Sequence, residues 1–165
     1  MSSEKLFRME VKGLMLDPTS NVPIVILRDE KGVEFLPIWI GVFEANAIAL
    51  KLEDVEPPRP MTHDLMASLL TSLGAEVLRV IISDLQESTF HARIVLQNRD
   101  GEIEVDARPS DAIALALRVE APIFVTERVF SKAKAADTSD LASDEEKLKK
   151  WFENVDPDDL GKYTM

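Results

Sequence analysis

The segment 102–125 constrains the fold more than any other part of the chain. It begins with strict alternation, in which Ile103, Val105 and Ala107 face one way and three acidic residues face the other, as in a half-buried β-strand. Pro109 then favours a helix start, where its missing N–H costs least. Residues 112–117 follow without a single charge. We therefore expect a helix over 109–119 that is buried on nearly all sides, with the other elements arranged around it.

Several polar side chains gather at the start of this predicted helix. Asp106 and Arg108 precede it, and Ser110 and Asp111 fall in its first turn. Unpaired amides and the positive end of the helix dipole favour oxygen atoms at this place. The pattern has two interpretations, a capped helix with an ion pair or the mouth of a functional site, and the residues alone leave both open.

The charge of the chain weighs against a large nucleic-acid surface. The 165 residues carry 19 lysines and arginines against 30 aspartates and glutamates, a formal net charge of −11. Nine of these acids and four of the lysines lie from Asp137 onward, so the preceding part still carries 21 acids against 15 bases, or −6. Surfaces that bind DNA or RNA are as a rule basic. Such binding would need a local basic patch or bridging metal ions.

Length and composition predict one domain in a reducing compartment. A chain of this size with 45% hydrophobic residues can bury one substantial core. The absence of cysteine excludes disulfides and thiolate metal sites. No apolar run approaches the roughly 18 residues of a membrane span, and the first residues lack the apolar core of a signal peptide. We expect a cytoplasmic protein without a membrane segment.

The hydrophobic patterns predict an α+β single domain, in which mixed or antiparallel β-hairpins pack with three core helices and a C-terminal helix follows. The main domain is expected over 1–134, and an acidic C-terminal helix and tail over 135–165. Residues 131–140 are predicted to be mobile because they are small and polar. The expected strands lie at 6–12, 24–27, 33–40, 75–83, 89–97, 102–107 and 122–125. The expected helices lie at 42–52, from a Thr62 cap to a Gly74 stop, at 109–119, and from Ser143 onward. The second of these helices is expected to have Leu65, Leu69, Leu70 and Leu73 on one apolar face.

Two further expectations concern the sheet. If Arg99 and Asp100 alone form a hairpin loop, Arg93 lies opposite Asp106 on the polar face. Pro23 and Pro37 each lack a ladder donor and belong at edges or bulges. The run Ala-Ile-Ala-Leu occurs at 47–50 and 112–115, each time after two strands, which suggests two related ββα units on one sheet system.

Acidic residues at predicted helix starts are candidates for a metal site. Glu44, Asp64, Asp106 and Asp111 offer the hard oxygen ligands that Mg²⁺ or Mn²⁺ prefers, provided that the fold brings them together. His63 follows a proline-rich linker at a helix start, where an anion can bind. Neither His63 nor His91 has a metal-binding partner at helical spacing, and no phosphate-binding glycine loop, zinc motif or nucleophile elbow is present.

Several blocks of this sequence resemble the bifunctional nuclease domain family. They lie in order across roughly residues 7–130: Gly13-Leu-Met-Leu-Asp17, Leu36-Pro-Ile-Trp-Ile-Gly41 with Glu44-Ala-Asn-Ala-Ile48, Arg59-Pro-Met-Thr-His-Asp64, and Asp106-Ala-Arg-Pro-Ser-Asp-Ala-Ile-Ala114. The closing run Val155-Asp-Pro-Asp-Asp-Leu-Gly-Lys-Tyr163 is similar to the tail of stand-alone bacterial members. The resemblance implies an α+β domain that assembles at least as a dimer, and an activity on DNA and RNA that was assigned to longer plant members.

Chemistry and resemblance together suggest a metal-assisted nuclease. Asp106 and Asp111, with Glu44 or Asp64, would hold the metal ion that activates water. Arg108 would stabilise developing charge and His63 would act as general acid or base. The alternative is a non-catalytic oligomeric module that binds a protein partner or small metabolite. Self-association is expected, because the apolar stripe of Leu148, Trp151, Phe152 and Val155 and the apolar hairpin 33–40 exceed what one small body covers. The sequence leaves open whether the stripe packs on its own body or on another subunit.

Overall fold

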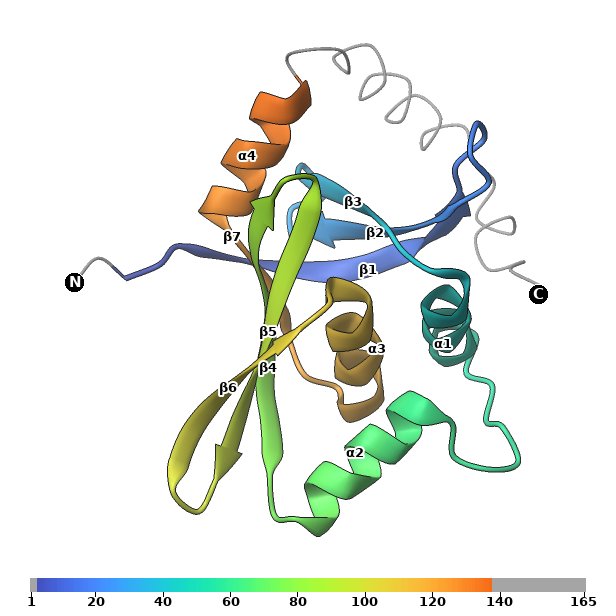
Figure 1. The fold of residues 1–165 in the computed structure, drawn as a ribbon, viewed down its shortest axis with the longest axis vertical. Coiled ribbons are helices and arrows are strands. Elements are labelled where there is room, and N and C mark those ends of the chain that lie inside the picture. Colours follow the sequence, from blue (N-terminus) through green and yellow to red (C-terminus); the bar gives the residue numbers. More distant parts are fainter. Residues whose placement is uncertain (1–2, 138–165) are drawn as a thin grey trace.

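A computed structural model of the chain describes residues 3–137, which form one α+β domain. A mixed seven-stranded sheet carries four helices (Figure 1). The elements in chain order are β1 (Leu6–Leu16), β2 (Pro23–Asp29), β3 (Phe35–Trp39), α1 (Val42–Leu52), α2 (Thr62–Ser72), β4 (Glu76–Gln86), β5 (Thr89–Asn98), β6 (Gly101–Ala107), α3 (Pro109–Val119), β7 (Ile123–Thr126) and α4 (Glu127–Asp137).

The sheet joins the first and last strands of the domain at its centre. Its order is β3-β2-β1-β7-β4-β5-β6, and every neighbouring pair is antiparallel except β4 and β7, which run parallel. The two expected ββα units, β2-β3-α1 and β5-β6-α3, therefore lie at opposite ends of one sheet. The β5–β6 loop is Arg99-Asp100, and Arg93 lies opposite Asp106, as the sequence predicts.

Helix α3 occupies the centre of the helical layer (Figure 1). It contacts α1, α2 and strands β4 and β5, and it begins and ends where the sequence predicts. The residues from Ala112 to Ala116 are all buried, while Leu117 is partly buried. The expected burial is therefore confirmed, because a helix without charges between Asp111 and Arg118 can turn apolar atoms toward every neighbour.

Strand β2 is buried on both faces, as its apolar run predicts. Ile24 to Leu27 are each at most 1% exposed. Val25 and Leu27 belong to the main core, whereas Ile24 and Ile26 pack with Met15 on the other face. Pro23 begins β2, and Pro37 lies in β3 at the end of the sheet, so neither proline removes a needed hydrogen bond from a central strand.

Helix α2 differs from its prediction in its cap and in its buried face. Met61, not Thr62, is the N-cap residue, and its N–H donates to Asp64 Oδ2 at 3.0 Å. This is the backbone half of a capping box, which a carboxylate three residues into the helix supplies without a capping hydroxyl. The core side holds His63, Met66, Ala67 and Leu70, whereas three leucines of the predicted apolar face, Leu65, Leu69 and Leu73, are exposed.

Helix α4 corrects the prediction of mobility for residues 131–137, and residues 138–140 lie outside the described part of the chain. It extends from Glu127 to Asp137, contacts β4 and β7, and buries Val129 and Phe130. Burial of these two residues at the helix start explains how a small, polar run continues as helix. The predicted division at 134/135 falls inside α4, and the predicted helix from Ser143 with its apolar stripe lies outside the described residues.

In residues 3–137, no helix combines the length and the apolar character that a membrane crossing requires.

The central role of α3 predicts a large effect of truncating its buried leucine. Leu115 is 0% exposed, so Leu115→Ala should lower the free energy of unfolding by about 2–5 kcal/mol, measured by urea denaturation. Leu117→Ala serves as the matched control and should cost less because Leu117 is only partly buried. A loss below about 1 kcal/mol for Leu115→Ala would contradict the central packing of α3.

Candidate functional site

Four of the predicted site residues form one chain of charged contacts. Arg108 lies between two carboxylates: its Nη2 donates to Glu44 Oε1 at 2.6 Å, and its Nε donates to Asp111 Oδ2 at 2.8 Å. The other oxygen of Asp111, Oδ1, lies 2.9 Å from His63 Nε2. Glu44, Arg108, Asp111 and His63 are called the Arg108 cluster below.

The Arg108 cluster is assembled from the starts of three helices. Glu44 is in the first turn of α1, His63 is the second residue of α2, and Arg108 is the N-cap of α3 with Asp111 in its first turn. The partial positive charge of a helix N-terminus stabilises carboxylates at such positions. Each helix therefore places its own polar residue locally, and the packing of α1 and α2 against α3 brings the three starts together.

A glycine gives Glu44 the space to reach Arg108. Gly41 is the N-cap of α1, and a Cβ atom there would overlap the Glu44 carboxylate. Its φ of −74° is open to any residue, so the glycine is required for this close approach and not for backbone conformation. Gly41 thus belongs to the site; it closes one of the family-like blocks of the sequence, but the sequence predicted no role for it at the site.

The contacts of Asp111 fix its charge. Burial acts to raise the pKa of Asp111, but the hydrogen bonds from Arg108 and His63 outweigh burial and hold that pKa below its usual range. The hydrogen bonds that Arg108 donates, chiefly to Asp111 and also to Glu44, raise the pKa of its own guanidinium. The carboxylate of Asp111 is therefore ionised at neutral pH and strongly bound on both oxygens.

The side chain of His63 is more buried than those of Asp111 and Arg108. Its side chain is 8% exposed, compared with 26% for Asp111 and 64% for Arg108. Because an ionised carboxylate can only accept hydrogen bonds, Nε2 of His63 carries the proton that it donates to Asp111. The ring thus orients Asp111, and Arg108 is the member of the cluster that solvent reaches most.

Asp64 belongs to a second, more buried contact centre. Arg118, whose side chain is 7% exposed, donates from Nε to Asp64 Oδ1 at 2.7 Å. Its remaining groups donate to two backbone oxygens, Ala114 at 2.8 Å and Ala47 at 2.9 Å. Burial acts to raise the pKa of Asp64, but the Met61 N–H and Arg118 together lower it. Sequence reasoning missed Arg118, because nothing local indicates that a charge near the end of α3 is buried.

Asp106 stands apart from these contacts. It is exposed on β6, and it makes no hydrogen bond or ion pair with the rest of residues 3–137. Arg93, which lies opposite it, instead pairs with Glu4 and with Glu104. The predicted backbone register is confirmed, but the side chain of Arg93 pairs with carboxylates other than that of Asp106.

The four predicted metal ligands do not form a prepared metal site. Arg108 occupies Glu44 and Asp111, Arg118 occupies Asp64, and Asp106 is separate. Within residues 3–137, no group of three histidines, aspartates and glutamates is placed to hold a metal ion. The described residues therefore offer no preformed set of three protein ligands. Mg²⁺ also binds through one or two carboxylates together with water and phosphate, and use of a metal in that way stays a prediction.

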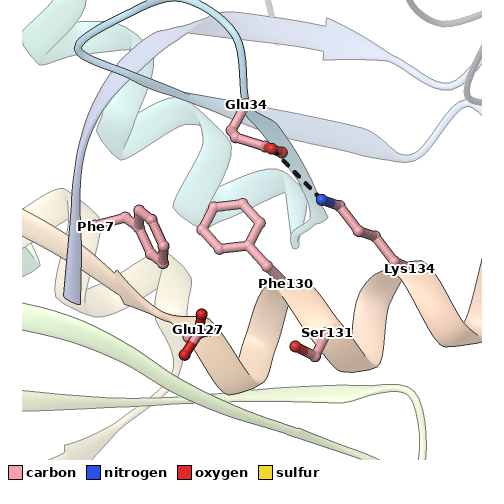
Figure 2. A pocket seen from close by; sticks show the side chains of 6 residues that line it. All are labelled: Phe7, Glu34, Glu127, Phe130, Ser131 and Lys134. Atoms are coloured by element: carbon pink, nitrogen blue, oxygen red, sulfur yellow. Dashed lines mark hydrogen bonds and ion pairs between the residues drawn. The ribbon is translucent and has the colours of Figure 1, made fainter. Parts of the chain in front are cut away.

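Surface hollows lie away from the Arg108 cluster. One of ≈ 160 Å³ lies beside α4 and is lined by Phe7, Glu34, Glu127, Phe130, Ser131 and Lys134 (Figure 2). Its two phenylalanines pack edge to face at 5.4 Å, and Lys134 pairs with Glu34 at 3.4 Å. This hollow is smaller than ordinary small-molecule sites, and its lysine is already paired with Glu34.

Comparison with known proteins decides the family. The model of the bifunctional nuclease domain matches residues 25–138, which include all members of the Arg108 cluster. The chain belongs to the bifunctional nuclease domain family. An uncharacterized protein of Mycobacterium tuberculosis (strain H37Rv) is 43% identical over 161 residues, which cover 92% of this chain and 96% of that protein. The resemblance found in the sequence motifs is thereby confirmed.

The plant relatives named as nucleases are more distant and much longer. Bifunctional nuclease 1 of Oryza sativa subsp. japonica is 30% identical over 110 residues, covering 64% of this chain and 33% of that protein. Bifunctional nuclease 1 of Arabidopsis thaliana is 27% identical over 109 residues, with 64% and 34% covered. This chain thus spans about a third of the plant bifunctional nucleases that it matches.

The depressed pKa of Asp111 predicts a pH-dependent contribution to stability. The contribution is complete above the unfolded-state pKa of about 3.9 and disappears as the pH falls through the lower folded-state pKa. Asp111→Asn should therefore cost about 1–3 kcal/mol of unfolding free energy at pH 7, and the difference from wild type should shrink below about pH 4. Urea unfolding at pH 7 and at several lower pH values measures both effects.

Asp106→Asn is the matched control, since Asp106 has no partner in residues 3–137 and its replacement should leave stability unchanged at pH 7. Equal stability of Asp111→Asn and wild type at pH 7 would contradict the assigned network.

Proposed function

We propose that this chain is a phosphodiester hydrolase acting on DNA and RNA, with Arg108 as the group that contacts the phosphate. Membership of the bifunctional nuclease domain family supports a nuclease-type function in general. The observation that carries the finer proposal is the exposed Arg108 guanidinium held between Glu44 and Asp111. A planar guanidinium fixed at the surface is well suited to bind phosphate oxygens in a defined orientation.

Arg108 retains donors for a ligand. A guanidinium has five N–H groups, and the contacts to Glu44 and Asp111 use the Nε and Nη2 atoms only. A phosphate oxygen can therefore bind at the exposed remainder without displacing either carboxylate. In the transition state the same N–H groups would stabilise the extra negative charge on phosphorus-bound oxygens.

Asp111 is the proposed partner of the attacking water. Water would bond to phosphorus as it loses a proton to Asp111, while the phosphorus–oxygen bond to the sugar breaks and the leaving oxygen takes a proton from solvent. Because Arg108 and His63 lower the pKa of Asp111, this carboxylate is a weak base at neutral pH. The geometry therefore supports slow hydrolysis, with Glu44 and His63 acting as positioning residues for Arg108 and Asp111.

Use of a divalent metal ion remains a prediction of the sequence. Carboxylates of the Arg108 cluster are bound to protein cations, and the described residues offer no three-ligand site. In the proposed reaction, residues of this chain alone bind the phosphate and take up the proton from water. Cleavage measured with EDTA, with Mg²⁺ and with Mn²⁺ tests the metal requirement directly.

A second candidate function is a non-catalytic binding module, and exposed apolar residues favour it. The leucines of α2 that face solvent are spaced four residues apart, at positions 65, 69 and 73, and Leu73 is 79% exposed. Exposed apolar rows of this kind mark interaction surfaces. Homo-oligomerisation is part of this proposal, and light scattering over a range of concentrations measures it.

Replacement of Arg108 tests the nuclease proposal. Arg108→Gln should reduce cleavage of single-stranded DNA and RNA by about 100-fold or more, because one charge-stabilising group is lost. Arg128→Gln is the matched control: Arg128 is 66% exposed and pairs with Asp84 at 3.8 Å, away from the cluster. Cleavage is measured by gel assay with protein purified in parallel. Equal activity of wild type and Arg108→Gln, or of wild type and buffer, would contradict the proposal.

Gly41→Ala offers an independent test of the positioning role of Glu44. The added methyl group should push the Glu44 carboxylate away from Arg108 and lower the cleavage rate about tenfold. The fold should tolerate alanine at this φ, so the melting temperature should stay near that of wild type. Unchanged cleavage in a folded Gly41→Ala variant would remove Glu44 from the proposed machinery.

A further inference from the structure

Strand β6 forms an open edge of the sheet. It is the last strand in the order and pairs only with β5 among the described strands (Figure 1). Alternate residues of an edge strand direct their N–H and C=O groups away from the sheet, where another strand can bind them. Proteins usually obstruct such an edge with proline, a bulge or charged side chains; residues 102–107 contain no proline or bulge, and their charged side chains are three acids.

The side of β6 that faces the helices is apolar and exposed. Ile103 and Val105 lie opposite Leu96 and Ile94 of β5, and they are 44% and 41% exposed. Val105 borders an open hollow of ≈ 250 Å³ between β5, β6 and α2. Only apolar residues line this hollow, which we call the α2–β6 groove: Met66, Leu69, Leu70, Ile94, Leu96, Val105 and Leu115.

The opposite side of β6 carries a row of acids. Glu102, Glu104 and Asp106 alternate with the apolar residues of the strand. Arg79 lies 3.6 Å from Glu102 and Arg93 lies 3.5 Å from Glu104, and both glutamates remain more than half exposed. Exposed ion pairs of this length are weak, so the acids can still bind a cation from outside.

We propose that β6 and the α2–β6 groove bind an extended segment of a partner protein in which apolar and basic residues alternate. The segment adds as a strand to the open edge of β6. Its apolar side chains then enter the groove beside Val105, and its lysines or arginines face the acid row. Strand addition of this kind takes affinity from backbone hydrogen bonds and specificity from alternate side chains. The proposal uses no residue of the Arg108 cluster.

Charge favours a partner segment of alternating apolar and basic residues over a second copy of this chain or a nucleic acid. A second copy that paired through its own β6 would place three acids against three acids, and like charges across a strand pair are destabilising. A nucleic acid would bring phosphates to the same acid row. The part of this chain from Asp137 onward holds nine acids against four lysines, so its net charge disfavours it as the occupant, although Lys147, Lys149 and Lys150 make one stretch of it basic. A strand of alternating basic and apolar residues can pair its basic side chains with the acid row of β6 and place its apolar side chains in the α2–β6 groove.

Peptide binding to the full-length chain tests the proposal. The probe is a fluorescein-labelled nine-residue peptide of alternating lysine and valine, followed by fluorescence anisotropy. It should bind at least tenfold more tightly than a peptide with the same residues in two blocks and than an alternating glutamate–valine peptide. Added salt should weaken the binding, because the charged contacts are exposed.

Variants place the binding on β6. Val105→Lys, which fills the groove entrance with charge, and Glu104→Lys, which reverses the acid row, should each weaken binding at least tenfold, with melting temperatures close to wild type. Glu56→Lys is the matched control, because Glu56 is exposed and has no ion pair within residues 3–137. Equal binding of all three peptides, or binding unaffected by Val105→Lys and Glu104→Lys, would overturn the proposal. A homodimer that Val105→Lys dissociates in light scattering would also overturn it, since a second copy would then be the occupant.

Discussion

The buried guanidinium of Arg118 holds the helical layer together. It links the side chain of Asp64 at the start of α2 to backbone oxygens of α1 and α3, at 2.7 to 2.9 Å. A charge that is only 7% exposed is tolerated because three donors have acceptors and one of these is a carboxylate. Removal of Asp64 would leave the Arg118 charge buried without a carboxylate partner. The relative placement of the three helices, and hence of the Arg108 cluster, depends on this contact.

The Arg108 cluster shows a balance between binding and catalysis. Glu44 and Asp111 fix Arg108 in place, which favours a defined contact with phosphate, but they also surround one cation with two anions. Such a site attracts a polyanion weakly, and the net charge of −11 weakens the attraction further. The same contacts lower the basicity of Asp111. For the proposed hydrolase, this arrangement favours orientation of the phosphate over attraction and rate.

The acidic character of the chain is distributed unevenly over its functional surfaces. At the starts of α1 and α3, carboxylates are paired with arginine and partly buried, whereas on β6 they stay exposed beside an apolar strip. Paired acids orient a neighbour, and exposed acids select the charge of a partner. Asp106 and Asp111 are five positions apart in the sequence, yet they belong to different surfaces. That separation places Asp106 apart from the Arg108 cluster.

The sequence by itself determined the local elements and the family. Helices α1 and α3 begin and end where glycine, proline and apolar periodicity predict, and the motif around Arg108 identifies the bifunctional nuclease domain. Only the tertiary structure decided which charges meet. Glu44 reaches Arg108 across 64 positions, Arg118 is buried, and the leucines of α2 face solvent. Short-range patterns record backbone conformation and amphipathicity, but the partner of a charged side chain depends on how separate helices pack, which no local pattern encodes.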